Sequence, residues 1–524
     1  MRQTSKRKSS LVSLFFKEKR VLIPLSCLGL FVGFLRVSFS QDEDMGWFTS
    51  ISSFVANGYK LYSEIYDIKD PFFFYSAAVS LKVFGRSGPF LIDLILIFFS
   101  APIAYAVAKS FGLTRNAAVI SSLTYLLVLT GNNYQAFRSQ IFAITLILVC
   151  TLLIQNLNYF TSGFIAFGII AFKMPLFIFF IGLIPLLISM KLNFKNWTRM
   201  FFGLLTSFLS FLLILAIRGE LAGYSQMVKD NIIYSRDYQS VVGLPTGFIG
   251  HLKIWNGFQG SAVALILMSV LLTKIYSNSI FQNIVNRNIQ IYAWGSVVST
   301  YIFLSLTALW PHHMQILCLP AFALMIQTSN LIFPVKNIDG VLVRSSRNKS
   351  KVGHETSPQN TRQLNLLVLI LFIAIPLNLG ANFDFKPRMS VESWTHHSWR
   401  VPPEVEMLNR LKTLSSKPVQ FTRLGMNDDL SLGAFLDHSK WKFSCSRYGI
   451  VGMESKIIVD KFNECIRTEV EVITLAPMFF NQNRPGIFLY YKKIIAKNLR
   501  ENFDCQSMRS DGYQLCIRKG SSIS

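Results

Sequence analysis

Long blocks of apolar residues, separated by short polar segments, run through most of the chain. A membrane-spanning helix needs about 20 mostly apolar residues, and the blocks approach that length without amphipathic alternation. The pattern therefore predicts an α-helical polytopic membrane protein with about 11 transmembrane helices. The expected spans are 21–39, 89–108, 116–130, 139–155, 162–172, 175–190, 198–217, 260–274, 289–307, 314–333 and 364–379.

The composition agrees with this interpretation. Of the 524 residues, 51% are hydrophobic and 15% are charged, and the formal net charge is +24. Soluble domains contain roughly a quarter of charged residues, so a water-soluble globular enzyme is disfavoured. The lysines and arginines lie between the apolar blocks rather than on one polar face, which indicates membrane topology rather than nucleic-acid binding.

The flanking charges set the expected orientation. Residues 1–20 form a basic tail, which places the N-terminus in the cytoplasm. The block 21–39 is longer than the apolar core of about 7–15 residues in a signal peptide, so we expect a retained anchor rather than a cleaved signal. The shorter block 71–85 is expected to lie in the outer interface, because counting it as a span would place the basic loop 334–363 outside. The C-terminus is then extracytoplasmic.

Three regions follow from this topology: a basic cytoplasmic tail (1–20), a transmembrane core (21–380) and an extracytoplasmic domain (381–524). The core has outer loops at 41–86 and 218–258. The last region has the composition of a soluble domain, and its helix and strand signals alternate, which predicts a small α/β domain. The helical signals are at 403–414, 455–467 and 488–501, and the strand signals are at 418–423, 470–475 and 512–518.

Four of the seven cysteines, Cys445, Cys465, Cys505 and Cys516, lie in the extracytoplasmic domain. Thiols oxidise outside the cytosol, so these four suggest two disulfides. Sequence does not settle the pairing, and proximity favours Cys445 with Cys465 and Cys505 with Cys516. A four-cysteine zinc site is the alternative, although paired CxxC spacing is absent.

The first outer loop is acidic in an otherwise basic protein. Residues 41–70 read QDEDMGWFTSISSFVANGYKLYSEIYDIKD, with Asp42 and Asp44 directly after the first span. The apolar residues between Trp47 and Val55 are spaced for an amphipathic helix on the interface. A carboxylate here could take a proton from an acceptor hydroxyl or hold a divalent cation facing a phosphate. Alternatively, the acids form a solvated helix-capping cluster.

These residues resemble the first extracytoplasmic loop of GT-C-fold integral membrane glycosyltransferases. The similarity lies in DMGW and in NGYKLYSEIYDIKDPFFFY, and the bacterial families related to protein O-mannosyltransferases and to the aminoarabinose transferase of lipid A are the most similar. Three later segments resemble further parts of these proteins: NNYQAFRSQ at 132–140, WPHHMQILCLP at 310–320 and DGYQLCIRK near the C-terminus.

The resemblance implies a GT-C-like core and an enzyme that moves a sugar from a polyprenyl-phosphate donor to an envelope acceptor (lipid, glycan or protein) on the outer face of the membrane. The general base would be Asp44, with Asp42 as its substitute. The acids that could complete a metal site are replaced by Ser139 and Gln140, so Mg²⁺ or Mn²⁺ is a possible cofactor without assigned ligands. The expected phosphate-binding cations are Arg138, Lys69, Lys173 and Arg236, and the expected substrate contacts are Glu64, Asp67, Tyr62, His312 and His313.

Two readings from other classes stay open. A transporter or lipid flippase would share many spans, although no internal repeat of the kind such folds commonly show is recognisable. An envelope scaffold of the same fold would carry inert loop acids. No Asn-x-Ser/Thr acceptor occurs in the expected outer segments, which favours a bacterial cytoplasmic (inner) membrane. We expect no nucleic-acid partner, because the basic residues lie between apolar blocks.

Overall fold

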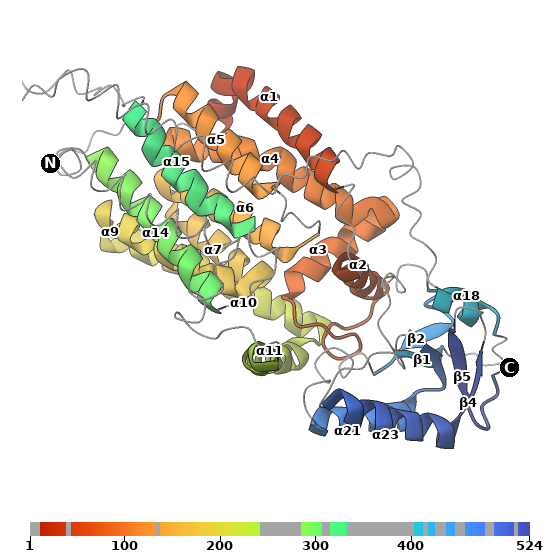
Figure 1. Cartoon of the computed structure of the whole chain (residues 1–524). Coiled ribbons are helices and arrows are strands. Elements are labelled where there is room, and N and C mark those ends of the chain that lie inside the picture. Colours follow the sequence, from red (N-terminus) through yellow and green to blue (C-terminus); the bar gives the residue numbers. More distant parts are fainter. Residues whose placement is uncertain are drawn as a thin grey trace, which may run out of the picture.

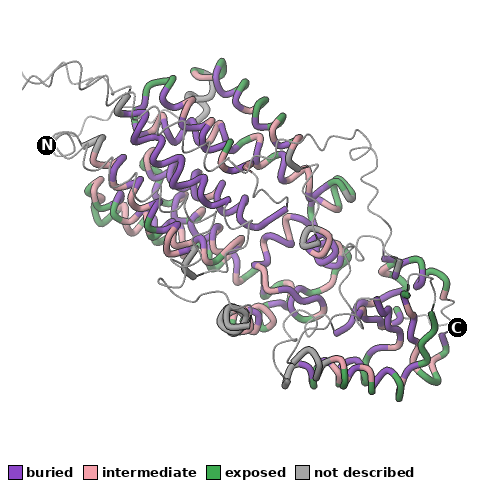
Figure 2. The backbone as a smooth tube through the Cα atoms, in the orientation of Figure 1, coloured by how far each residue is buried: buried purple, intermediate pink, exposed green. Residues whose placement is uncertain are grey.

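The computed structural model describes a bundle of long helices and a smaller domain built on a sheet (Figure 1). The described residues are 11–37, 43–131, 137–241, 284–306, 315–332, 403–411, 418–424, 436–445, 456–476, 487–507 and 512–523. The spans expected at 260–274 and 364–379 lie outside them, so the number of spans stays a prediction. Figure 2 shows buried positions where the bundle helices face one another and exposed positions along their outer sides.

Three helical runs among the described residues are long and apolar enough to cross a bilayer: Gly88–Ser110, Tyr159–Ser189 and Phe194–Arg218. Large apolar side chains such as Phe201 and Ile217 are exposed on the last of these, as expected for a helix surrounded by lipid. The bundle helices are α1 (Leu11–Val37), α4 (Gly88–Ser110), α5 (Arg115–Leu129), α6 (Ser139–Gln155), α7 (Tyr159–Lys173), α8 (Ile178–Gly182), α9 (Ile184–Ser189), α10 (Phe194–Arg218), α14 (Ile284–Leu306) and α15 (Cys318–Ile332).

Helices α7 and α10 pack in parallel through glycines. A Cβ on Gly163 would overlap the carbonyl oxygen of Met200, so the two backbones are in close contact near the start of both helices. One turn further along α7, the ring of Phe167 contacts that of Phe211, with centroids 5.4 Å apart. Both helices therefore run toward the end of the bundle that faces the sheet domain, here called the sheet-side end (Figure 1).

The chain reverses direction at Lys173. Its φ of −160° and ψ of 89° are extended, so the helix breaks before the short η2 (Met174–Phe177). Helix α9 ends only four residues before α10 starts, so α8 and α9 must lead back to the end where α10 begins. The continuous run therefore consists of two antiparallel pieces, and Lys173 lies at the turn between them, at the sheet-side end.

Helices α2 (Glu43–Ala56) and α3 (Pro71–Phe84) lie together at the sheet-side end (Figure 1). The carboxylate of Asp70, at the start of α3, accepts a hydrogen bond from the Met174 backbone N–H at the chain reversal (3.1 Å). Residues near the other end of α3 contact the first residue of α4, where a Cβ on Gly88 would overlap the backbone of Ser80. Helix α3 thus stays at one end of the bundle, the geometry expected of an interfacial helix.

The C-terminal domain has a five-stranded sheet in the order β2-β1-β3-β5-β4. Strands β2, β1 and β3 are parallel to one another. Strand β5 pairs antiparallel with β3 on one side and with the edge strand β4 on the other. The strands are β1 (Val419–Leu424), β2 (Trp441–Phe443), β3 (Val472–Leu475), β4 (Phe503–Ser507) and β5 (Gln514–Arg518), and the helices are α18 (Pro403–Asn409), α21 (Lys456–Glu469) and α23 (Ile487–Asn502). The three expected helices and the three expected strands are present, and their bounds agree with the expected ones to within a few residues. Strands β2 and β4 were not expected.

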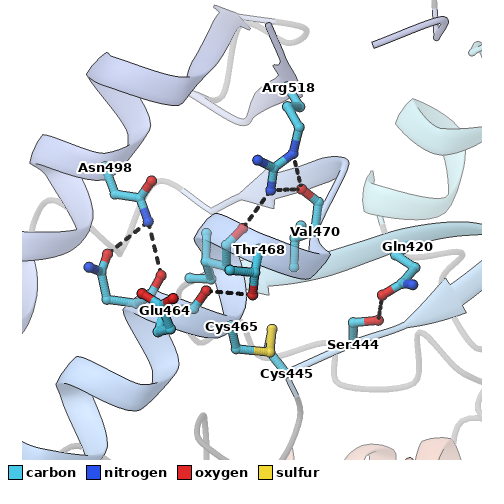
Figure 3. Close-up of a disulfide and its surroundings, with 11 residues drawn as sticks. Gln420, Ser444, Cys445, Glu464, Cys465, Thr468, Val470, Asn498 and Arg518 are labelled. Atoms are coloured by element: carbon cyan, nitrogen blue, oxygen red, sulfur yellow. Dashed lines mark hydrogen bonds between the residues drawn. A yellow bond between two sulfur atoms is a disulfide. The ribbon is translucent and has the colours of Figure 1, made fainter. Parts of the chain in front are cut away.

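Two disulfides cross-link this domain. Cys445, just after β2, is joined to Cys465 of α21 (Figure 3), and Cys505 of β4 is joined to Cys516 of β5. These are the pairs that proximity along the chain favours. With their sulfurs bonded to one another, the four cysteines offer no thiolates to a zinc ion.

The glycine contact between α7 and α10 leads to a stability prediction. Gly163→Ala would force the helices apart, and overpacking of this kind costs about 1–3 kcal/mol, so the unfolding temperature of the detergent-solubilised protein should fall. Gly168→Ala, on the same helix, is the matched control, because its Cβ would meet only the Leu146 Cδ1 at 3.3 Å. Equal unfolding temperatures for both variants would contradict the packing described here.

Candidate functional site

Helix α2 places an aromatic face at the sheet-side end. The residues predicted to form an amphipathic helix do so, and Phe48, Ile51 and Phe54 are each at most 4% exposed. The Phe48 ring contacts the Phe73 ring of α3, with centroids 5.3 Å apart. The apolar face is therefore covered by protein, whereas the sequence had suggested contact with the lipid interface.

The turn that follows α2 is held by its own side chains. Tyr62 has a φ of +69°, in the left-handed region that non-glycine residues seldom occupy, and its side chain is buried. Its hydroxyl donates a hydrogen bond to the backbone carbonyl of Lys69 (2.8 Å). This hydrogen bond closes the loop, and the expected contact between Tyr62 and substrate stays a prediction.

Three of the four expected phosphate-binding cations gather at the sheet-side end. The Lys69 Nζ lies 5.7 Å and the Arg138 Cζ 5.3 Å from the centroid of the same Phe48 ring, so two cations flank one aromatic face. Lys173, at the chain reversal, interacts electrostatically with both of them. Arg236 lies on α11 (Leu221–Val241), and its side chain is outside the described part of the molecule.

Two buried carboxylates accompany these cations. Asp67 is 3% exposed and accepts hydrogen bonds from the Trp47 Nε1 (2.7 Å) and the Lys69 backbone N–H (2.8 Å). Burial raises the pKa of Asp70 to about 6, although the Met174 N–H and the nearby Lys173 and Lys69 act to lower it. We call Lys69, Arg138, Lys173, Asp67 and Asp70 the charge cluster.

The remaining expected residues lie elsewhere or outside the described residues. Glu64 is partly exposed; it accepts a hydrogen bond from the Lys60 backbone N–H (2.8 Å) and pairs with Lys442 of the C-terminal domain (3.6 Å). Asp44 is in the first turn of α2, and its side chain is not among those described. Three further residues, Asp42, His312 and His313, lie outside the described ranges. Their proposed roles stay predictions.

Among the described residues, no group of metal-ligating side chains lies around the charge cluster. Within the described residues, the group whose ligand atoms lie within metal-binding distance of one another is Cys445, Cys465 and Glu469. Its two sulfurs are joined in a disulfide.

Sequence reasoning missed a buried acid that contacts the loop. Glu220 is 0% exposed and accepts hydrogen bonds from the Leu61 backbone N–H (3.0 Å), the Arg218 Nε (2.9 Å) and the Tyr75 hydroxyl. In the sequence, the signal that could have identified Glu220 is a single acidic residue directly after the glycine that ends an apolar helix. Its partners are far away in sequence, so no local pattern identified them.

Two more acids also hold parts of the site. Asp230 of α11 accepts a hydrogen bond from the Tyr66 hydroxyl (2.6 Å), which fixes the far side of the loop. Asp93, fully buried in α4, accepts the backbone N–H of Phe137 (2.5 Å), the residue directly before Arg138.

The C-terminal domain touches the same loop through the edge strand β2. The Tyr59 hydroxyl donates to the Trp441 carbonyl (3.2 Å), and the Phe54 ring stacks on the Phe443 ring at 5.6 Å. The loop is therefore enclosed between the bundle, α11 and the sheet.

The chain is similar to proteins whose structures have been solved. No protein-family model and no curated protein matches the chain. ArnT from Cupriavidus metallidurans, in the apo state, aligns with a TM-score of 0.48 and 11% identity over 96% of this chain and 98% of that chain. Archaeal oligosaccharyltransferase AglB from Archaeoglobus fulgidus, in complex with an inhibitory peptide and a dolichol-phosphate, aligns with a TM-score of 0.43 and 10% identity over 96% and 75%.

Both are GT-C-fold glycosyltransferases, the class that the sequence motifs resemble.

The raised pKa of Asp70 predicts a pH-dependent stability. Its folded value of about 6 lies above the ordinary 3.8, so the folded state binds the proton more tightly. The wild type should then lose stability relative to Asp70→Asn as the pH rises from about 4 to about 6, by about 2–3 kcal/mol in all. Thermal unfolding of the two proteins across this range measures the difference.

Asp437→Asn serves as a control of opposite sign. A hydrogen bond from the Ser439 hydroxyl lowers the pKa of this exposed carboxyl, so here the wild type should lose stability relative to the variant as the pH falls. A difference between wild type and Asp70→Asn that does not change with pH would contradict the assignment.

Proposed function

We propose that this protein is a membrane glycosyltransferase that moves a sugar from a polyprenyl-phosphate-linked donor to an envelope acceptor (lipid, glycan or protein) at the outer face of a bacterial inner membrane. The observation that carries the proposal is the charge cluster: three cations from three separate chain segments meet at the sheet-side end of an apolar bundle. The motifs of the first loop, which resemble those of GT-C glycosyltransferases, support the same reaction.

The cations suit a lipid-borne phosphate. An isoprenoid tail partitions into the bilayer, so its phosphate is presented at the membrane boundary, where we place the sheet-side end. Arg138 offers a planar fork that can bind two phosphate oxygens, and Lys69 and Lys173 offer compact charges. When the sugar is transferred, negative charge develops on the departing phosphate, and fixed cations stabilise that charge without reorganising.

The carboxylates keep the cations in place before the donor binds. Asp67 and Asp70 compensate part of the positive charge, and each is itself held by backbone or indole N–H groups. Each of the three cations can donate a hydrogen bond to a phosphate oxygen. An anionic phosphate therefore matches the cluster.

The base in this proposal is Asp44, with Asp42 as substitute. Asp44 lies in the first turn of α2, the helix whose Trp47 indole donates a hydrogen bond to Asp67 of the charge cluster. We keep Arg236 as a proposed phosphate-binding cation. The proposed substrate contacts remain Tyr62, Glu64, Asp67, His312 and His313.

The phosphate role predicts a loss of lipid-phosphate binding. Lys69→Met and Lys173→Met should each weaken the binding of a polyprenyl phosphate to the nanodisc-reconstituted protein about 10-fold or more, since a hydrogen bond to a charged group contributes about 1.5–3 kcal/mol. Lys82→Met is the matched control, because Lys82 is exposed on α3. Unchanged affinity in both test variants, or an equal loss in the control, would refute the phosphate role.

The base predicts a separate effect on turnover. Asp44→Asn should reduce product formation about 10²–10⁴-fold, the usual contribution of a general base, while polyprenyl-phosphate binding is retained. The measurement is mass spectrometry of envelope lipids and glycans from a deletion strain that expresses each variant. Because only a transferase makes a new glycosidic bond, the wild-type product also separates this function from a flippase. Undiminished product from the Asp42→Asn, Asp44→Asn double variant would exclude both bases.

A further inference from the structure

The carboxylate of Glu220 lies at the junction of three elements. Helix α10 ends at Gly219, whose φ of +68° is left-handed, and this tight turn brings the next residue, Glu220, back against the first loop. The side chain is fully buried. A buried carboxylate is tolerated only when it is paired and hydrogen-bonded, and this one has an arginine and two further donors.

Two of the three donors come from opposite ends of the segment 61–75, and the third comes from the end of α10. Leu61 donates its backbone N–H from the beginning of the loop (3.0 Å), and Tyr75 donates its hydroxyl from α3, after the loop has ended. Arg218 donates its Nε (2.9 Å) and places its guanidinium 4.8 Å from the centroid of the Tyr75 ring. One carboxylate therefore bridges the two ends of the segment 61–75, within which Lys69 lies.

Contacts within the loop carry this constraint to Lys69. Tyr62 follows Leu61 directly, is held in the left-handed region, and bonds the Lys69 carbonyl. The first turn of α11 packs closely on Tyr62, because a Cβ on Gly223 would lie 2.9 Å from the Tyr62 Cβ. A shift of Leu61 would therefore move the Tyr62 ring and, through its hydroxyl, the backbone of Lys69.

We propose that Glu220 is a positioning residue that fixes Lys69 against the Phe48 ring and so sets the affinity for the donor's phosphate. This inference rests on the proposed function, because it assigns Glu220 an effect through a phosphate-binding lysine. Glu220 itself does not contact the donor. Its negative charge matters because a glutamine of the same size has one acceptor oxygen instead of two and no charge for Arg218.

The test is a double-mutant cycle on polyprenyl-phosphate affinity. In the nanodisc-reconstituted protein, Glu220→Gln should weaken binding about 5- to 10-fold, because small displacements of binding groups are costly. In the Lys69→Met background, the same change should weaken binding less than about twofold, since residues that act through one another are not additive. A merely structural role would weaken binding equally in both backgrounds.

Glu18→Gln is the matched control. Its carboxylate accepts a hydrogen bond from the Tyr105 hydroxyl (3.1 Å), which likewise links two parts of the bundle, but it lies away from Lys69. This variant should leave the affinity unchanged. If Glu220→Gln does not fold, Tyr75→Phe removes one donor and keeps the charge; it should weaken binding about two- to threefold, again only when Lys69 is present.

The outcomes separate this inference from the function on which it rests. Equal losses with and without Lys69, or no loss from either Glu220→Gln or Tyr75→Phe, would overturn the positioning role and leave the proposed function intact. No loss from Lys69→Met would overturn the positioning role by removing its premise, whereas the phosphate role of the charge cluster is overturned only if Lys173→Met also leaves the affinity unchanged.

Discussion

The burial of unlike charges at one end of an apolar bundle is the constraint on which the rest of the site depends. An ion removed from water costs several kcal/mol unless a counter-charge and hydrogen bonds replace its hydration. The charged groups of Lys69 and Arg138 both lie over the Phe48 ring, and Asp67 accepts the backbone N–H of Lys69. The gathering of three cations at this end is the reason that we propose a phosphate site here.

The charged residues of the cluster lie at the ends of helices rather than in their middles. Pro71 at the first position of α3 suits a helix start and puts Asp70 just outside the helix. The Asp70 side chain makes no capping bond to its own helix; it accepts the Met174 N–H where the chain reverses. That bond holds the start of α3 against the end of α7, which carries Lys173. Arg138 likewise precedes the first residue of α6, so these cations lie where helices begin or end.

The sequence predicted those features whose signal is local. Apolar length indicated the bundle, and alternating periodicity located β1, β3 and the helices of the C-terminal domain within a few residues. Strand β2 was missed because Trp441–Phe443 is too short to show a period. The face of α2 was recognised as apolar, but the pattern does not say whether lipid or protein covers it. The role of Glu220 was missed because its partners Leu61 and Tyr75 are about 150 residues away in the sequence. Only the fold brings these residues together, so no local pattern identifies them.

The anchoring of the first loop differs in strength from one side to the other. On the domain side, the ion pair between Glu64 and Lys442 is partly exposed, with side chains 36% and 42% accessible, and such pairs contribute only about 0–1 kcal/mol. On the bundle side, Glu220 is buried and its loss leaves donors unpaired, which costs far more. The loop is therefore fixed chiefly to the bundle, so the charge cluster keeps its geometry even if the sheet domain shifts. A binding site whose cations are pre-positioned in this way spends little of the donor's binding energy on ordering the loop.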